Sequence, residues 1–219
     1  MTVDFKDILE AVKDARKKAK KRNFTQSFEL FVNLKDVDLK RIKDKVRGSV
    51  TLPHEFKKPL KYAVIADGEL ATQAKNLGLD VLDKSDIEIL GGDKKKLKRI
   101  ANKYNGFITR VDLMPTVAKN MGQVLGPRGK MPTPVPPNAK LDQVLSNASK
   151  TVKFRLKNSP TITVRVGDEL MSDEEIAENI RAFLNAVVEK LDKGWRNIKS
   201  AYVKLSMGPA IPIQISKNK

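Results

Sequence analysis

The hydrophobic pattern of this chain changes near residue 59 and changes back near residue 150. Between these points, short continuous apolar runs at residues 62–66 and 107–111 alternate with helical segments. Such runs are typical of strands buried on both faces of a parallel sheet. Outside these points apolar and polar residues alternate singly, which indicates antiparallel strands with one face in a core. The pattern therefore predicts that the middle of the chain is inserted into a domain built from its two ends.

The predicted fold class is an α+β split domain that carries an inserted α/β domain. Residues 1–58 and 151–219 are expected to form an antiparallel sheet with helices. Residues 59–150 are expected to form a Rossmann-like domain with a small parallel sheet. Because the chain crosses between the two domains twice at one boundary, we expect a hinge there.

Amphipathic helices and alternating strands make up the predicted split domain. Apolar residues recur at spacings of three and four in residues 5–19 and 176–191, which predicts two helices. Ser172 and Glu175 have the spacing of a capping box at the start of the second helix. Strands are predicted at residues 28–34, 46–52, 152–156, 162–166 and 201–207. The third and fourth of these strands are expected to form a hairpin through the turn at residues 158–160.

The inserted segment is predicted to alternate strands and helices before a long loop. Gly78 is expected to end a short helix that begins at Glu69. Ser85 and Glu88 have capping-box spacing. Residues 122–138 are rich in glycine and proline and are predicted to be a loop. The other helices are expected at 94–104 and 141–148, and the strands at 62–66, 81–82 and 107–111.

Positive charge is the strongest signal in the composition. Lys and Arg number 43 against 26 Asp and Glu, so the formal net charge is +17. Such an excess predicts a polyanionic partner, because cations that neutralise phosphates release condensed counterions. Composition favours nucleic acid without naming its kind, and a general DNA-compacting protein stays open on charge alone. Aromatic residues are 5% of the chain, so recognition of the shape and backbone of folded RNA fits better than a base-stacking platform.

The residues that the chain lacks exclude several kinds of site. It has no cysteine and one histidine, His54, which excludes disulfides, thiolate zinc sites, cysteine nucleophiles and multi-histidine metal sites. It has no apolar run long enough to cross a bilayer and no signal peptide at Met1. We therefore expect a cytoplasmic protein without a membrane partner.

The sequence around Gly129 invites comparison with a nucleotide-binding phosphate loop. That motif requires an earlier glycine at the position of Val124 and a magnesium-binding hydroxyl at the position of Met131. Both requirements fail. A dinucleotide site after residues 62–66 also fails, because its turn has only Gly68 and then an acidic residue that would repel a pyrophosphate.

Catalysis by His54 lacks support from the surrounding sequence. The chain has no Gly-x-Ser-x-Gly elbow to supply a nucleophile, and His54 follows a proline at a predicted strand end. We predict a binding protein that is not an enzyme and that uses no metal and no cofactor. The competing class, a nucleotide-dependent RNA-modifying enzyme, lacks both a glycine cradle and a plausible base.

Basic residues gather in three segments. The run at residues 16–22 ends the first helix, where the helix dipole favours cations, so a solvated helix end and a phosphate contact are both open. The basic helix at 94–104 is equally ambiguous. Lys153, Arg155 and Lys157 share one face of a predicted strand, where like charges seldom stack without a counter-surface. Protection of a sheet edge against aggregation is the alternative for this face.

Two glycine-containing segments have the composition of a backbone contact to RNA. In residues 126–130, glycines and the guanidinium of Arg128 suit a phosphate, although a proline-fixed surface turn explains them equally well. In residues 206–209, a hydroxyl can hydrogen-bond to a 2′-OH or a phosphate, and Met207 can lie against a sugar or a base. Gly208 permits close approach of the backbone.

Four segments together resemble the ribosomal protein L-one family in its archaeal form. They are residues 22–29 (Arg-Asn-Phe-Thr-Gln-Ser-Phe-Glu), 52–54 (Leu-Pro-His), 125–132 (Leu-Gly-Pro-Arg-Gly-Lys-Met-Pro) and 206–209 (Ser-Met-Gly-Pro). The resemblance extends in order over essentially the full chain and includes the inserted-domain layout. The Gly-Pro-Arg-Gly stretch is its most specific part.

The resemblance implies a structural protein of the large ribosomal subunit. Such a protein binds large-subunit rRNA to form a mobile stalk and takes part in release of deacylated tRNA from the exit site. The family also implies repression of translation through binding of the protein's own operon mRNA. The expected partners are therefore large-subunit rRNA, exit-site tRNA and the protein's own mRNA. The protein is expected to be monomeric when free and otherwise part of cytoplasmic ribosomes.

The resemblance also implies where the split domain contacts RNA. The contacts fall on the first and last strands, and a carboxylate among them must accept from a 2′-OH or an amino group rather than meet a phosphate. The expected primary RNA contacts are Phe24, Thr25, Ser27, Glu29, Ser206, Met207 and Gly208. The expected secondary contacts come from the glycine-containing loop and from the cationic strand. They are Gly126, Arg128, Gly129, Lys130, Lys153 and Arg155.

Three positions depart from the usual pattern of the family. Glu55 stands where a glycine commonly follows the histidine, so the turn there is expected to differ. Ser206 replaces a commoner threonine, which keeps the hydroxyl and loses a methyl contact. Lys130 occupies a position that is often apolar in bacterial members, which would strengthen an RNA contact there.

Overall fold

The structure is a computed structural model that describes residues 3–38, 46–156 and 159–215. The chain divides into two compact units, the first made of Met1–Lys58 with Asn147–Lys219 and the second of Pro59–Ser146. The first unit contains an antiparallel sheet with helices and the second a small parallel sheet, so the predicted fold class is confirmed. The second boundary between the units falls inside helix α7 (Leu141–Lys150), whereas the sequence placed it after residue 150.

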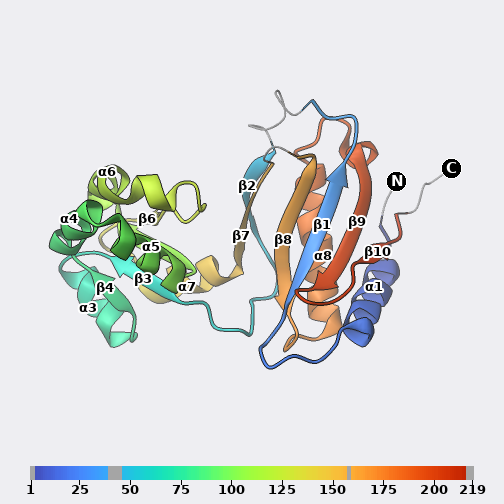
Figure 1. The fold of residues 1–219 in the computed structure, drawn as a ribbon, viewed down its shortest axis with the longest axis horizontal. Helices are drawn as coiled ribbons and strands as arrows, with labels where there is room; N and C mark the ends of the chain where they lie inside the picture. The colour runs from blue at the N-terminus through green and yellow to red at the C-terminus, as the bar shows by residue number, and fades with distance from the viewer. Residues whose placement is uncertain (1–2, 39–45, 157–158, 216–219) are drawn as a thin grey trace. The chain divides into compact units, whose positions relative to one another are not determined.

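The main sheet of the first unit has four antiparallel strands in the order β10-β9-β1-β8 (Figure 1). These strands are β1 (Ser27–Leu34), β8 (Thr161–Asp168), β9 (Ile198–Leu205) and β10 (Ile211–Ile213). An early strand, β1, therefore lies between two strands from the last third of the chain. Buried and half-buried residues alternate along β1 as the sequence predicted, with Phe28, Leu30 and Val32 fully buried.

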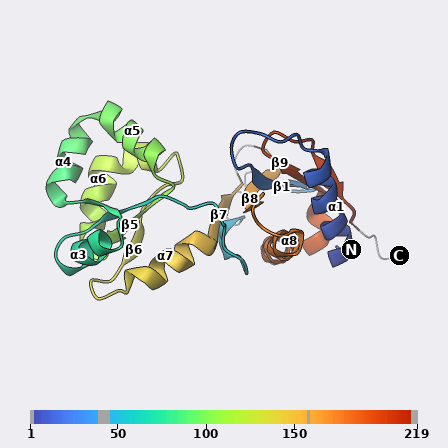
Figure 2. The same ribbon diagram turned by 90° about the horizontal axis from the view of Figure 1, so that it is seen from below.

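Helices α1 (Phe5–Lys18) and α8 (Asp173–Val188) pack against each other and cover one face of this sheet (Figure 2). Apolar side chains from both helices and from the sheet form one core, in which Ile8 and Phe183 are fully buried. The predicted capping box is confirmed, because the Ser172 side chain accepts from the N–H of residue 175 while that residue's carboxylate accepts in return.

Arg16 joins the end of α1 to the segment before α8. Its Nε donates to Asp173 Oδ1 at 2.8 Å, and its two Nη atoms donate to the carbonyls of Glu169 and Met171 at 2.7 and 2.8 Å. The guanidinium also lies 5.3 Å from the centroid of the Phe28 ring. The first cation of the basic run is therefore engaged inside this unit.

A second antiparallel sheet in this unit pairs β2 (Arg47–Thr51) with β7 (Thr151–Arg155). The predicted hairpin between residues 152–156 and 162–166 is wrong, because β7 pairs with β2 and β8 pairs with β1. Alternation of apolar residues identifies a strand and its buried face, but it does not identify the neighbouring strand.

The second unit is a parallel sheet in the order β4-β3-β5-β6, with helices on both faces (Figure 2). Its strands are β3 (Tyr62–Ile65), β4 (Asp80–Leu82), β5 (Gly106–Arg110) and β6 (Thr133–Val135). Its helices, besides the start of α7, are α3 (Glu69–Asn76), α4 (Lys84–Gly92), α5 (Lys94–Lys103) and α6 (Met114–Leu125). Ile65 packs with α4, α5 and α6, while Val64 packs with α3 and α7. Burial on both faces explains the continuous apolar run of β3.

Two local predictions in this unit are wrong. Helix α6 is absent from the sequence prediction, and the loop predicted at 122–138 instead contains the end of α6 and all of β6. At the start of α4 the cap is Asp83, whose side chain accepts from the N–H of Asp86 at 2.8 Å. Ser85 lies inside the helix and donates its hydroxyl to Asp83 at 2.6 Å.

Candidate nucleic-acid interface

Pairing of β1 with β9 brings the two expected primary RNA-binding segments together. Phe28 is in register with Leu205, and the backbone N–H of Ser206 donates to the carbonyl of Ser27 at 3.0 Å. The N–H of Ser27 donates in return to Ser206 Oγ at 3.3 Å. Residues that are 179 positions apart in sequence thus form one continuous surface.

Gln26 is a buried amide that holds this surface together. Its side chain is 2% exposed, and its Oε1 accepts from the backbone N–H of Met207 at 3.1 Å. Its Nε2 donates to the carbonyl of Lys20 at 3.2 Å, and its own carbonyl accepts from the N–H of Glu169. Sequence reasoning missed Gln26, although the alternation that buries residues 28 and 30 also places this amide at a core position.

Large apolar side chains are exposed on both segments. Phe24 is 50% exposed and Met207 is 58% exposed. Each is adjoined by groups that can hydrogen-bond, namely the backbone of Thr25 and the hydroxyl of Ser206. Apolar surface beside hydrogen-bonding groups suits the sugars and bases of an RNA minor groove better than it suits bare phosphates.

Glu29 is the one acid among the expected primary contacts. It is half-buried, and Ser206 Oγ lies 3.3 Å from its Oε1. Across the sheet it is in register with Arg165 of β8 and Lys204 of β9. A carboxylate in this position can accept from a 2′-OH, and it repels phosphate. Of the two flanking cations, Arg165 is bound to Asp168 and stacks on the Phe56 ring, so Lys204 is the better placed to meet a phosphate.

Gly208 packs tightly against the end of α1. A Cβ at this position would lie 3.2 Å from the Cβ of Ala19 and 3.4 Å from that of Leu205. The N–H of Gly208 also donates to the carbonyl of Leu205 at 2.8 Å, which closes a tight turn after β9. Packing inside the unit therefore accounts for this glycine in addition to any close approach by RNA.

Thr25 is anchored by the residue at which the chain leaves the first unit. Lys58 Nζ donates to the carbonyl of Thr25 at 3.1 Å, and the Lys58 backbone N–H donates to Asp168 Oδ2 at 2.9 Å. Asp168 is fully buried, and it also accepts from Arg165 Nη2 at 3.2 Å and from the N–H of Leu170 at 3.1 Å. A satisfied buried carboxylate thus fixes the segment that presents Phe24 and Thr25. Sequence reasoning did not assign a role to Lys58 or Asp168.

Lys153 and Arg155 lie on β7 and therefore outside the sheet that carries the primary contacts. Both are exposed, and Arg155 is in register with Arg47 of β2. Lys157, the third cation predicted for this face, lies outside the described residues. The structure thus gives the first unit two separate groups of expected RNA contacts.

The loop at residues 126–130 caps two helices of the second unit. Gly129 has φ of +69°, and the N–H of Lys130 donates to the carbonyl of Leu125 while that of Gly129 donates to Gly126. These two bonds form the Schellman motif that ends α6, and its left-handed position favours glycine. The glycine at residue 129 is thus required by the turn itself.

The charged side chains of this loop also point to helix ends. Lys130 Nζ donates to the carbonyls of Ala101 and Tyr104 at 2.7 Å each, where it complements the C-terminal end of α5. Burial, and then the nearby charge of Arg128, lower the pKa of Lys130. Arg128 is exposed, and its Nη1 donates to the carbonyl of Val124 at 3.1 Å. We infer that Lys130 serves the fold, whereas Arg128 keeps an exposed side chain.

The other candidate sites from the sequence have structural partners. His54 Nε2 lies 2.6 Å from Glu178 Oε2, and the backbone of His54 is bound by the side chain of Asn179. Among the residues that the structure describes, no group of three or more His, Cys, Asp or Glu side chains could hold a metal ion. Nor does any helix in the described ranges combine the length and apolar character needed to span a membrane.

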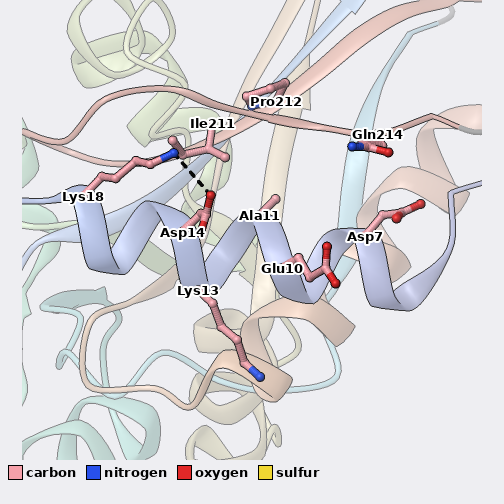
Figure 3. A pocket seen from close by; sticks show the side chains of 9 residues that line it. All are labelled: Asp7, Glu10, Ala11, Lys13, Asp14, Lys18, Ile211, Pro212 and Gln214. Atoms are coloured by element: carbon pink, nitrogen blue, oxygen red, sulfur yellow. Dashed lines mark hydrogen bonds and ion pairs between the residues drawn. The ribbon is translucent and has the colours of Figure 1, made fainter.

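A groove between α1 and β10 is unsuited to RNA. Its lining includes Asp7, Glu10 and Asp14 from α1 beside Ile211 and Pro212, as Figure 3 shows. The three acids outnumber the two lysines of the lining, Lys13 and Lys18, and would repel phosphates. Lys18 is moreover bound to Asp14 at 3.2 Å at one end of the groove.

Comparison with known proteins gives the family. The model of the ribosomal protein L1p/L10e family matches residues 15–209. This chain belongs to that family. Among relatives named large ribosomal subunit protein uL1, that of Methanothermococcus thermolithotrophicus is 51% identical over 215 residues, covering 98% of this chain and 100% of the relative. Those of Methanocaldococcus jannaschii and Pyrococcus abyssi are 48% and 47% identical, with 99% and 98% of each chain covered. The L1p/L10e match spans both units and both segments of the candidate interface.

Proposed function

We propose that this protein is a component of the large ribosomal subunit that binds large-subunit rRNA through its first unit. The observation that carries the proposal is the single surface formed by Ser27 and Ser206, which the buried Gln26 stabilises through its hydrogen bond with Met207. Membership of the L1p/L10e family and the names of its archaeal relatives support it. The primary contacts are those expected from the sequence, with Arg128, Lys153 and Arg155 as weaker ones.

The RNA bound by this surface is a folded stem region rather than a plain duplex. The surface combines exposed apolar side chains, a hydroxyl and a carboxylate, and Glu29 would repel a regularly spaced phosphate backbone. Such a mixed surface discriminates by shape and by 2′-OH groups, whereas the net charge of +17 supplies affinity that does not depend on sequence.

The complex on the ribosome is a mobile stalk that assists release of deacylated tRNA from the exit site. Away from the ribosome, the protein is a monomer that uses the same surface to bind its own operon mRNA and so represses translation. This part of the proposal rests on the family resemblance. One surface would then bind both RNAs. It predicts that the rRNA fragment and the mRNA leader compete for the protein.

Binding of the stalk rRNA fragment tests the proposal. Replacing Phe24 and Met207 together by Ala is expected to lower affinity for this fragment by on the order of a hundredfold, since each loses an apolar contact to RNA. Ile89→Ala is the matched control, because it truncates a side chain of the second unit that is 62% exposed. Equal affinity of the double variant and the control protein would contradict the proposal, as would equal affinity of the unmodified protein for duplex DNA at moderate salt.

A further inference from the structure

Helix α5 presents a dense group of cations on the second unit. Lys94, Lys95, Lys98 and Arg99 are all exposed, while Leu97 and its neighbour at residue 101 face the core. We call these four exposed side chains the α5 basic face. The helix is 10 residues long, and one cationic face therefore extends over most of it.

The placement of these cations lowers the stability of the helix. Three lysines occupy the first turn of α5, where the positive end of the helix dipole disfavours them, and that turn has no acidic residue. Lys94 and Lys98 are four positions apart, as are Lys95 and Arg99, so like charges also repel along the face. The cap residue Asp93, just before the helix, partly offsets these charges by accepting from two backbone N–H groups.

The chain neutralises this face only in part, through the electrostatic interaction of Arg99 with the Asp93 carboxylate. None of its four side chains makes an ion pair within the described residues, and the one ion pair at the start of α5 joins Lys96 to Asp93 at 3.9 Å. Lys103, at the other end of the helix, is held by Asp80 at 2.9 Å and does not belong to the face. Arg16 of the first unit shows the contrast, since it lies at a helix C-terminus and has three internal acceptors.

We propose that the α5 basic face is a separate binding site for the phosphate backbone of double-stranded RNA. Cations that lower the stability of their own helix and make no ion pair within the described residues are available to an external anion. None of the four side chains of the face is apolar or aromatic, whereas a protein partner would require an apolar centre to its interface. Contact with the phosphate backbone requires only positive charge at suitable spacing.

Lys130 gives this site a fixed support. By binding the last carbonyls of α5 at Ala101 and Tyr104, its ammonium holds the C-terminal end of the helix against the loop that follows α6. The first turn is held by Asp93. The basic face is therefore presented on a helix that is capped at both ends, and ordering it on binding RNA loses little entropy.

The test compares two triple variants of the full chain in binding a mixed-sequence RNA duplex. Replacing Lys94, Lys95 and Lys98 by Gln is expected to lower affinity on the order of tenfold at about 0.1 M salt, and to reduce the slope of log affinity against log salt by about 2 to 3. The matched control replaces Lys75, Lys84 and Lys119 by Gln, which removes the same charge from exposed positions of the same unit. The control is expected to change affinity by less than about threefold.

A third variant, in which the same three lysines of α5 become Arg, distinguishes an effect of lost charge on affinity from an effect of a disturbed fold. This variant is expected to keep the affinity, because the positive charge remains. An equal loss in the Gln variant and its control would overturn the proposal, and so would a loss in the Arg variant. The plain duplex lacks the stalk fold, so this result is independent of whether the first unit recognises the stalk fragment.

Discussion

The backbone N–H of Met207 donates to Oε1 of Gln26 across 181 positions of sequence. The bond lies beneath the candidate interface and links the turn after β9 to the segment that enters β1. Its acceptor is almost completely buried. The shape of the candidate interface therefore depends on a buried side chain.

Replacing Gln26 by Leu is expected to weaken both the fold and RNA binding. The change leaves the N–H of Met207 and the carbonyl of Lys20 without their partner, which lowers the free energy of unfolding by about 1–3 kcal/mol. Denaturant unfolding and affinity for the stalk fragment are the measurements. Gln123→Leu is the control, since Gln123 is an exposed amide of the second unit. A Gln26 variant that behaved like this control would show that the buried amide is dispensable.

Glu29 is expected to separate specific from non-specific binding. Glu29→Ala should lower affinity for the stalk fragment on the order of tenfold through loss of an acceptor for a 2′-OH. The same variant should bind a plain RNA duplex more tightly, because it removes a charge that repels phosphates. Glu29→Gln keeps an acceptor and should retain most of the specific affinity. Glu10→Ala controls for the loss of charge, and loss of both affinities in the Glu29 variant would argue against this role.

The capping carboxylate of Glu175 predicts a defined acid dependence of stability. Its hydrogen bond from the N–H of Ser172, and then its contact with Lys57, lower the pKa of Glu175 in the folded state. Its contribution is therefore complete above the unfolded pKa of about 4.3 and is lost as the pH falls through the lower folded pKa. Glu175→Gln should thus be less stable than the unmodified protein near pH 6 and approach it near pH 3.

Thermal unfolding between these pH values measures this difference. Glu174→Gln is the matched control, because Glu174 is an exposed carboxylate in the same turn of α8. A difference between Glu175→Gln and the unmodified protein that stayed constant down to pH 3 would rule out the capping contact as its source.

Lys130 is expected to matter for stability and not for RNA. Lys130→Met removes two hydrogen bonds to the C-terminal carbonyls of α5 and should lower the free energy of unfolding by about 1 kcal/mol or more. Affinity for the stalk fragment should change less than about twofold. Lys119→Met is the control from the same unit. A tenfold loss of affinity without a loss of stability would instead place Lys130 in contact with RNA.

Periodicity and capping made most of the fold predictable from sequence. The alternation in β1 and the capping box at Ser172 are local signals, and the structure confirms both. The partner of β7 was not predictable in this way, because the choice between β2 and β8 depends on packing between distant segments. Helix α6 was missed because the sequence pattern predicts no element between residue 111 and Gly122 and starts a loop at Gly122, although the helix tolerates this glycine close to its end.

The candidate interface was predictable as a set of segments but not as an arrangement. Sequence motifs identified residues 22–29 and 206–209, which the pairing of β1 with β9 brings together. They did not reveal that Gln26 and Lys58 hold those segments from behind, since these contacts depend on the tertiary fold. The same limit applies to Lys130, whose charge suggested RNA whereas its ammonium lies on helix carbonyls.

The position of β1 between β8 and β9 has a consequence for how the protein is made. During synthesis β1 emerges early, and both of its neighbours begin only at residues 161 and 198. A nascent chain stopped before residue 198 would expose one unpaired edge of β1 and would lack Ser206 altogether. Contacts of such long sequence separation also form slowly. The candidate interface should therefore form late in synthesis, and fragments left by interrupted translation would lack it.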